Sequence, residues 1–240
     1  MDPTESGGGN RDGLLPMINR VRNNWRDRSL TSLLVIQIIT LFILVPLAGD
    51  GFPMPGGAAV LLLLVVMSLT IVMARGRWTL VAGLTTFLLS GIATILAVRM
   101  PSVAMEVLRS SIALVTFSIL AIVVSKAVFG PGPFTNHRIL GAIVLYLNIG
   151  LLFSFLYRII ALILPDAYSH LPSPFDEAKF AASLDYFSFT TMTSVGYGDI
   201  LPLRPVSRSL CALESIMGQL FPTVLIARVV SLATMGKNSD

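Results

Sequence analysis

The sequence predicts an all-α membrane protein with six transmembrane helices. Of its 240 residues, 54% are hydrophobic and only 12% are charged, and its mean hydropathy is +0.80. A soluble domain carries about 25% charged residues, so this chain has too few charges to cover a surface that faces water. It also contains six apolar runs, each close to the roughly 20 residues that a helix needs to cross a bilayer. These observations argue against a soluble enzyme.

The six apolar runs can be taken in chain order. They lie at residues 30–48, 58–74, 79–98, 103–129, 138–164 and 207–235. We divide the chain accordingly into an N-terminal segment (1–29), a four-helix domain (30–129), a linker (130–137), a second membrane domain (138–235) and a short tail (236–240).

The N-terminal segment is polar, so no cleavable signal peptide is expected. Within it, apolar residues at a spacing of four, three and four predict a basic amphipathic helix at 14–29, lying on the membrane surface. The alternative is that these residues simply extend the first span.

Basic residues set the expected orientation. Lysines and arginines gather before the first run, between the second and third, and between the fourth and fifth. Because basic loops stay in the cytoplasm, both termini are predicted to be cytoplasmic. The compact size of the chain favours the plasma membrane of a prokaryote. The outer segment 165–206 also carries basic residues and is the longest link, which indicates that something is folded inside it.

That link contains an amphipathic stretch at 177–192, which predicts a short helix, followed by the sequence TSVGYGD at 193–199. A dehydrated potassium ion needs oxygen dipoles in place of its water, and a row of backbone carbonyls can supply them. Turning successive carbonyls to one side requires backbone angles that glycine adopts easily, as at Gly196 and Gly198. A plain Gly-Tyr-Gly-Asp turn is the alternative, but irregular backbone between two membrane spans must be buried or line a water-filled path.

On this motif, the chain resembles the bacterial six-span potassium channels of the voltage-gated-like pore superfamily, most closely over 141–232. The resemblance implies a re-entrant pore helix and selectivity filter, and a homotetramer around a central pore that also contacts membrane lipid. The filter would be lined by the following residues: Ser194, Val195, Gly196, Tyr197 and Gly198. One strand per chain cannot enclose an ion, so four copies are also needed on geometric grounds.

The resemblance also implies supporting residues around the filter. Tyr186 and Phe187 match a pair of aromatics that brace it, although core packing would explain them equally. Thr190, where some members have a carboxylate, and Thr193 lie next to the filter, and Asp199 would stand at its outer mouth.

In the sixth run, Gly218 matches the glycine at which inner helices of the family bend, and Pro222 adds a second flexible point. Close helix packing is the alternative role for Gly218. Gln219, Pro222 and Ile226 share one face and are expected to line the cavity. An acid within a membrane span is a candidate functional group, so Glu214 is predicted behind the filter, bonded to Thr190 or Thr191. A place in an outer water-filled crevice is the alternative.

The fourth run has a basic residue only near each end, Arg109 and Lys126, and Glu106 is spaced to pair with Arg109. A voltage sensor needs several basic residues along the span. We therefore expect a passive potassium-selective channel with little voltage dependence. A potassium uptake transporter subunit and a non-conducting regulatory subunit are the alternatives. We expect no enzymatic activity, no organic cofactor and no nucleic-acid partner; the permeant K⁺ ions are the only ligand expected.

Overall fold

The structure, a computed structural model, describes residues 31, 34–52, 77–100, 102–130 and 136–237, and all its regular elements in these ranges are helices. The predicted surface helix at 14–29 and the predicted second span at 58–74 lie outside the described residues. Three described helices are long and apolar enough to cross a membrane, within Val103–Lys126, Arg138–Ile163 and Pro205–Ser231. Leu34–Gly49 and Leu88–Ala97 are shorter apolar helices.

The first described helix changes register within its length. The π-helix η1 (Thr40–Leu44) leads into α2 (Val45–Gly49), and the N–H of Val45 bonds to the carbonyl of Thr40, five residues back. Pro46 lies just beyond and has no N–H to donate. A π-turn next to a proline is a known way to accommodate the missing bond.

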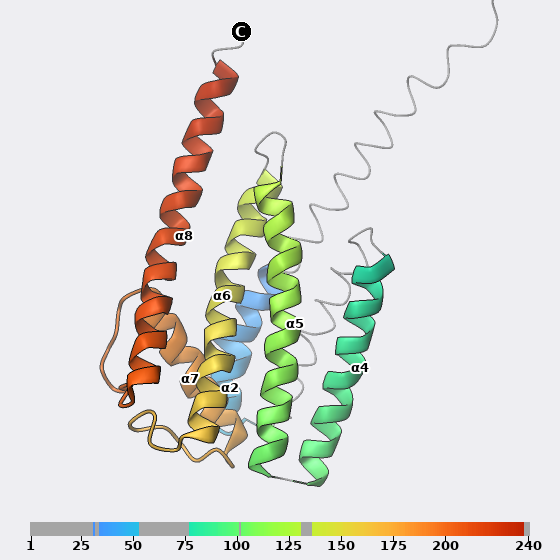
Figure 1. Ribbon diagram of the computed structural model, residues 1–240, viewed down its shortest axis with the longest axis vertical. Coiled ribbons are helices and arrows are strands. Elements are labelled where there is room, and N and C mark those ends of the chain that lie inside the picture. Colours follow the sequence, from blue (N-terminus) through green and yellow to red (C-terminus); the bar gives the residue numbers. More distant parts are fainter. Residues whose placement is uncertain (1–30, 32–33, 53–76, 101, 131–135, 238–240) are drawn as a thin grey trace, which may run out of the picture.

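Helices α4 (Arg77–Arg99), α5 (Val103–Phe129) and α6 (Asn136–Ile163) run up and down beside one another (Figure 1). Helix α5 begins at Ser102, whose hydroxyl caps the helix by accepting from Met105 N at 3.3 Å. In the core between α5 and α6, the amide of Asn148 donates to the Phe117 carbonyl at 2.9 Å. The α5 bounds coincide with those expected from sequence.

The short helix α7 (Glu177–Met192) also has the expected bounds, and it lies between α6 and the long helix α8 (Pro205–Lys237). Asp176 caps its start by accepting from Lys179 N at 3.4 Å. In Figure 1, α8 extends past the ends of α5 and α6 toward its own C-terminal end. The turn between α4 and α5 lies at the same end of the bundle as the 164–176 segment, and the C-terminus lies at the other.

Candidate functional site: the TSVGYG segment and its supports

The TSVGYG segment (residues 193–198) leaves the C-terminal end of α7 and is held there by the helix itself. The carbonyl of Thr190 accepts from Val195 N at 2.9 Å and from Gly196 N at 3.2 Å. The hydroxyl of Thr193 donates to the Phe189 carbonyl at 2.7 Å. The start of the segment is therefore fixed by the last turn of α7.

The backbone of this segment alternates in handedness. Ser194, Gly196 and Gly198 have φ values of 59°, 52° and 81°, whereas Val195 and Tyr197 between them do not have positive φ. Successive residues of opposite hand turn their N–H groups to one side, which leaves the carbonyls free to face the other. No atom lies within 4 Å of a Cβ built on Gly196 or Gly198. Glycine is thus favoured there by its backbone angle and not by a lack of space.

The side chains of the segment divide between solvent and the neighbouring helix. In the single chain, Val195 is 53% exposed and Tyr197 is 72% exposed. The ring of Tyr186 stacks flat on that of Tyr197, with centroids 6.1 Å apart and an interplanar angle of 7°. Phe187 faces the opposite way and is buried against the rings of Tyr157 and Tyr168. Tyr186 therefore contacts the segment and Phe187 belongs to the core. Asp199 is exposed.

Helix α8 approaches the segment at two consecutive residues. A Cβ on Gly218 would lie 1.9 Å from the Met192 carbonyl oxygen, so α8 packs directly on the end of α7. Gln219 Nε2 donates to the Ser194 hydroxyl at 3.1 Å. Helix α8 continues through Gly218 and Pro222, so of the two roles considered for Gly218 the structure displays close packing. Gln219 and Ile226 are exposed in the single chain, and Pro222 is partly exposed.

Glu214 is fully buried, with 0% of its surface exposed. The Tyr157 hydroxyl donates to its Oε2, and the Ser188 hydroxyl lies within hydrogen-bond distance of its Oε1. The predicted partners, Thr190 and Thr191, are wrong. The Thr190 hydroxyl donates to the Phe187 carbonyl at 3.0 Å, and the Thr191 carbonyl accepts from Ser215.

The physical reason for this correction is the rotation of α7. Ser188 lies two and three residues before the threonines, on the face that contacts Gly150 of α6 and Glu214 of α8. The burial of Glu214 also excludes its alternative place in an outer crevice. The side chain does contact α7, as expected.

An ion cluster, which the sequence predicted only in part, ties α5 to α6 and α7. The predicted pair is confirmed, with Arg109 Nη2 and Glu106 Oε2 separated by 2.8 Å. Glu106 also pairs with Arg158 of α6 at 3.0 Å, and Arg109 pairs with Glu177 in the first turn of α7. The signal for Arg158 was a basic residue inside an apolar run, which is rarely without a partner.

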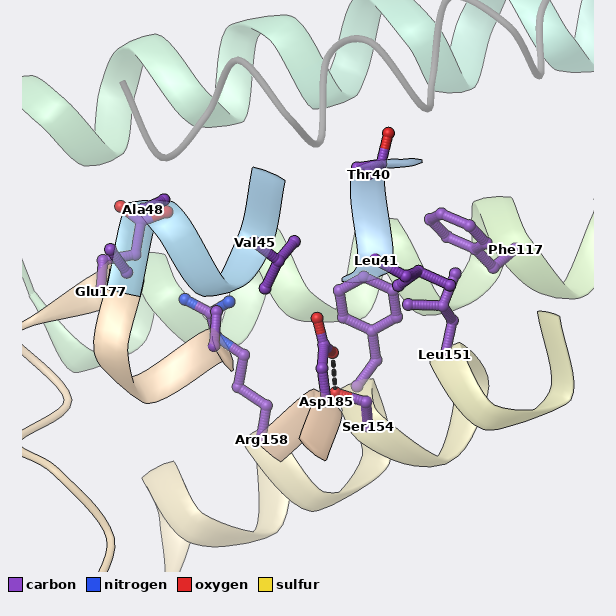
Figure 2. A pocket seen from close by; sticks show the side chains of 13 residues that line it. Thr40, Leu41, Val45, Ala48, Phe117, Leu151, Ser154, Arg158, Glu177 and Asp185 are labelled. Atoms are coloured by element: carbon purple, nitrogen blue, oxygen red, sulfur yellow. Dashed lines mark hydrogen bonds between the residues drawn. The ribbon is translucent and has the colours of Figure 1, made fainter. Parts of the chain in front are cut away.

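A cavity lies beside this cluster, behind α7 (Figure 2). Its apolar wall comes from η1, α2, α5 and α6: Leu41, Val45, Ala48, Phe117, Leu151 and Phe155. Asp185 of α7 accepts a hydrogen bond from Ser154 at its edge, and the Arg158 side chain points into the same space. The Nε of Arg158 has no hydrogen-bond partner among the described residues. The cavity therefore has polar groups, from Asp185 and Arg158, at one end and apolar side chains along the rest of its wall.

Two arginines hold polar groups at opposite ends of the molecule. In the outer segment, Arg204 pairs with Asp166, and its guanidinium holds the pKa of that carboxyl below its ordinary value. At the other end, Arg228 Nη2 of α8 donates to the carbonyls of Phe129 and Gly130, at 2.8 Å and 3.3 Å. Its guanidinium also lies 5.2 Å from the centroid of the Phe129 ring. Sequence reasoning missed Arg228, because it shows no pairing pattern on its own helix.

Over residues 142–235, the chain matches a protein family described as "Ion channel". This range contains most of α6, all of α7, the TSVGYG segment and nearly all of α8. No curated protein and no solved structure matches the chain.

Residues 142–235 are therefore similar to an ion-channel domain. Three of the described helices are long and apolar enough to span a bilayer, which together with the match points to an integral membrane protein. The match supports a role in ion transport.

Proposed function

We propose that the protein is a potassium-selective channel, in which four copies surround a pore and residues 194–198 of each form the selectivity filter. The observation that carries the proposal is the alternation of backbone hand at Ser194, Gly196 and Gly198. A row of carbonyls turned to one side can replace the hydration shell of K⁺ when several copies face one another. A single chain supplies only one wall of such a cage.

The position of α7 supports this function electrostatically. The helix ends at Met192, directly before the segment. The C-terminal end of a helix carries a partial negative charge of about half an electron. In the proposed tetramer, four α7 helices would be pore helices whose negative ends face the inner cavity, where they favour a cation.

The open surface of α8 supports the tetramer. Only 11% of its apolar span is buried within the chain, against 61% for α6. Large apolar residues remain exposed along it: Leu213, Ile216, Leu220, Val224, Ile226 and Val230. In the proposed assembly, part of this surface packs against the neighbouring subunit and the face with Gln219 and Ile226 lines the cavity.

The remaining features follow from the sequence. The chain crosses the membrane six times, with both termini in the cytoplasm of a prokaryote, and the first four spans lack the charges of a voltage sensor. The placement of the 164–176 segment and the C-terminus at opposite ends of the bundle fits this orientation.

The test is ion flux into liposomes that contain only this protein. K⁺ flux is expected to exceed Na⁺ flux by a large factor, and Ba²⁺ is expected to block it. Gly196→Ala should abolish selective flux but leave the assembly intact, because its backbone needs a left-handed residue while the space around it is open. Equal permeability to Na⁺ and K⁺ in the wild-type protein would refute the filter assignment.

A further inference from the structure

Around Glu214, the buried oxygen–oxygen contacts outnumber the hydroxyl protons that are available to form hydrogen bonds in them. Three contacts lie in series: Tyr157 hydroxyl to Glu214 Oε2, Ser188 hydroxyl to Glu214 Oε1, and Ser188 hydroxyl to the Gly150 carbonyl at 2.6 Å. Each hydroxyl carries one proton, and a backbone carbonyl carries none. Tyr157 and Ser188 therefore supply two protons for three hydrogen bonds.

The third proton has one available source. Gly150 can only accept, so the bond at 2.6 Å takes the proton of Ser188. The contact between Ser188 Oγ and Glu214 Oε1 then lies between two acceptors unless the carboxyl group itself carries a proton. A protonated carboxylic acid has one O–H donor and retains a carbonyl acceptor. In that form, Glu214 donates to Ser188, accepts from Tyr157, and completes all three bonds.

In the part of the chain that the structure describes, Glu214 has no basic ion-pair partner that would favour its ionised form. Among the described residues, Tyr146 and Tyr157 of α6, Tyr168 of the outer segment and Cys211 of α8 interact with it, and none of these four side chains is basic. Among the described residues, no lysine, arginine or histidine forms an ion pair with it. An unpaired carboxylate with no exposed surface is costly at membrane depth.

We propose that Glu214 is an un-ionised carboxylic acid at neutral pH, and that its proton forms the hydrogen bond to Ser188 by which α8 positions α7. The three bonds join α6, α7 and α8 one turn before Met192, the residue directly before the TSVGYG segment. Glu214 is thus a positioning residue, and this role rests on the proposed function of that segment. The neutral state of the carboxyl group does not depend on which ion passes.

The test is infrared spectroscopy of the full chain in lipid bilayers at neutral pH. The wild-type spectrum minus that of Glu214→Gln should contain the carbonyl band of a protonated carboxylic acid. Ser188→Ala should shift this band to that of a more weakly bonded acid, because the O–H loses its acceptor. Glu177→Gln is the matched control, since Glu177 is paired with Arg109 and should contribute carboxylate bands only.

A second measurement uses the wild-type protein alone, so its result does not depend on whether a variant folds. The chain has only four glutamates, so carbon-13 labelling of their side chains should give one carboxyl resonance of the protonated type in the wild-type protein. Carboxylate bands for Glu214, or four resonances of the ionised type, would overturn the proposal. Either result would leave the flux comparison of K⁺ and Na⁺ unaffected, so the two proposals fail separately.

Discussion

Helices α5 and α8 are both long enough to cross a membrane, but they satisfy their polar groups in opposite ways. In the middle of α5, the hydroxyls of Ser111, Thr116 and Ser118 each donate to a carbonyl four residues back on the same helix. In α8, Glu214 bonds to α6 and α7, and Gln219 bonds to the TSVGYG segment. These three hydroxyls of α5 therefore bond within their own helix, whereas Glu214 and Gln219 join the first half of α8 to the site.

At its two ends, in contrast, α5 is bonded to neighbouring helices. Ion pairs of Arg109 tie the start of α5 to α7, and hydrogen bonds from Arg228 tie its end to α8. Beyond Pro222, Arg228 links α8 to the end of α5. The links of α5 to α7 and α8 thus lie at its ends, and the links of α8 to the site lie in its first half.

The largest effect is expected where α8 is held most closely. Gly218→Ala would place a Cβ 1.9 Å from the Met192 carbonyl oxygen, a contact that must displace one of the two helices. We expect a loss of roughly 3 kcal/mol or more in stability, measured as a lower melting temperature in detergent or nanodiscs.

Gly91→Ala in α4 is the matched control, because no atom of another described segment lies within 4 Å of its Cβ. It should be neutral or gain up to about 1 kcal/mol. A Gly218→Ala protein as stable as the wild type would show that α7 and α8 do not pack this closely.

A smaller effect is expected at the link between α8 and the end of α5. Arg228→Gln removes charged hydrogen bonds to Phe129 and Gly130 and the contact with the Phe129 ring. We expect a loss of about 1–3 kcal/mol in thermal stability. Arg208→Gln, which removes an exposed bond to the Pro202 carbonyl, is the control and should change little. If the two variants behave alike, the two helices are not joined at this point.

Voltage dependence should be weak, because α5 is fixed at its charged end. One elementary charge crossing the whole field is worth about 2.3 kcal/mol per 100 mV, and a steep sensor moves roughly 3–4 charges in each subunit. Arg109 is paired with both Glu106 and Glu177 and has little freedom to move. Open probability in a planar bilayer without divalent ions should change gradually with voltage. A steep sigmoid, equivalent to more than about four charges per tetramer, would mean that α5 does move.

The smallest effect is expected at Asp166, which lies at the exposed outer end. Its bond from Arg204 lowers the carboxyl pKa, so the stability it contributes is present above the unfolded value of about 3.9 and is lost as the pH falls through the lower folded value. Asp166→Asn should therefore differ slightly from the wild type near neutral pH, and the difference should vanish in acid. Thermal melts of both proteins across this range check the sign. A difference that grows in acid would contradict it.

The sequence predicted individual helices well and their mutual rotation poorly. The bounds of α7 were predictable because a capping Asp176 precedes it and a Gly-rich segment follows it. The partners of Glu214 were not predictable, because Tyr157 is 57 residues away along the chain and apolar residues surround all faces of α6. The cluster of Glu106, Arg158 and Glu177 was missed for the same reason. Close packing at Gly218 was one of two open roles, since a glycine in a helix fits both a bend and a contact.

The backbone of Ser194 is left-handed, a conformation that glycine adopts more easily than serine. A left-handed angle costs a residue with a Cβ about 1–2 kcal/mol, yet the chain has serine here and glycine at the next two left-handed positions. What serine adds is an oxygen that Gln219 of α8 reaches at 3.1 Å. In the proposed tetramer, four such pairs encircle the place where an ion exchanges carbonyl oxygens for water. A small rotation of α8 would then move the Ser194 hydroxyl through its bond to Gln219. It would change the oxygens around the ion without a change in the rest of the pore.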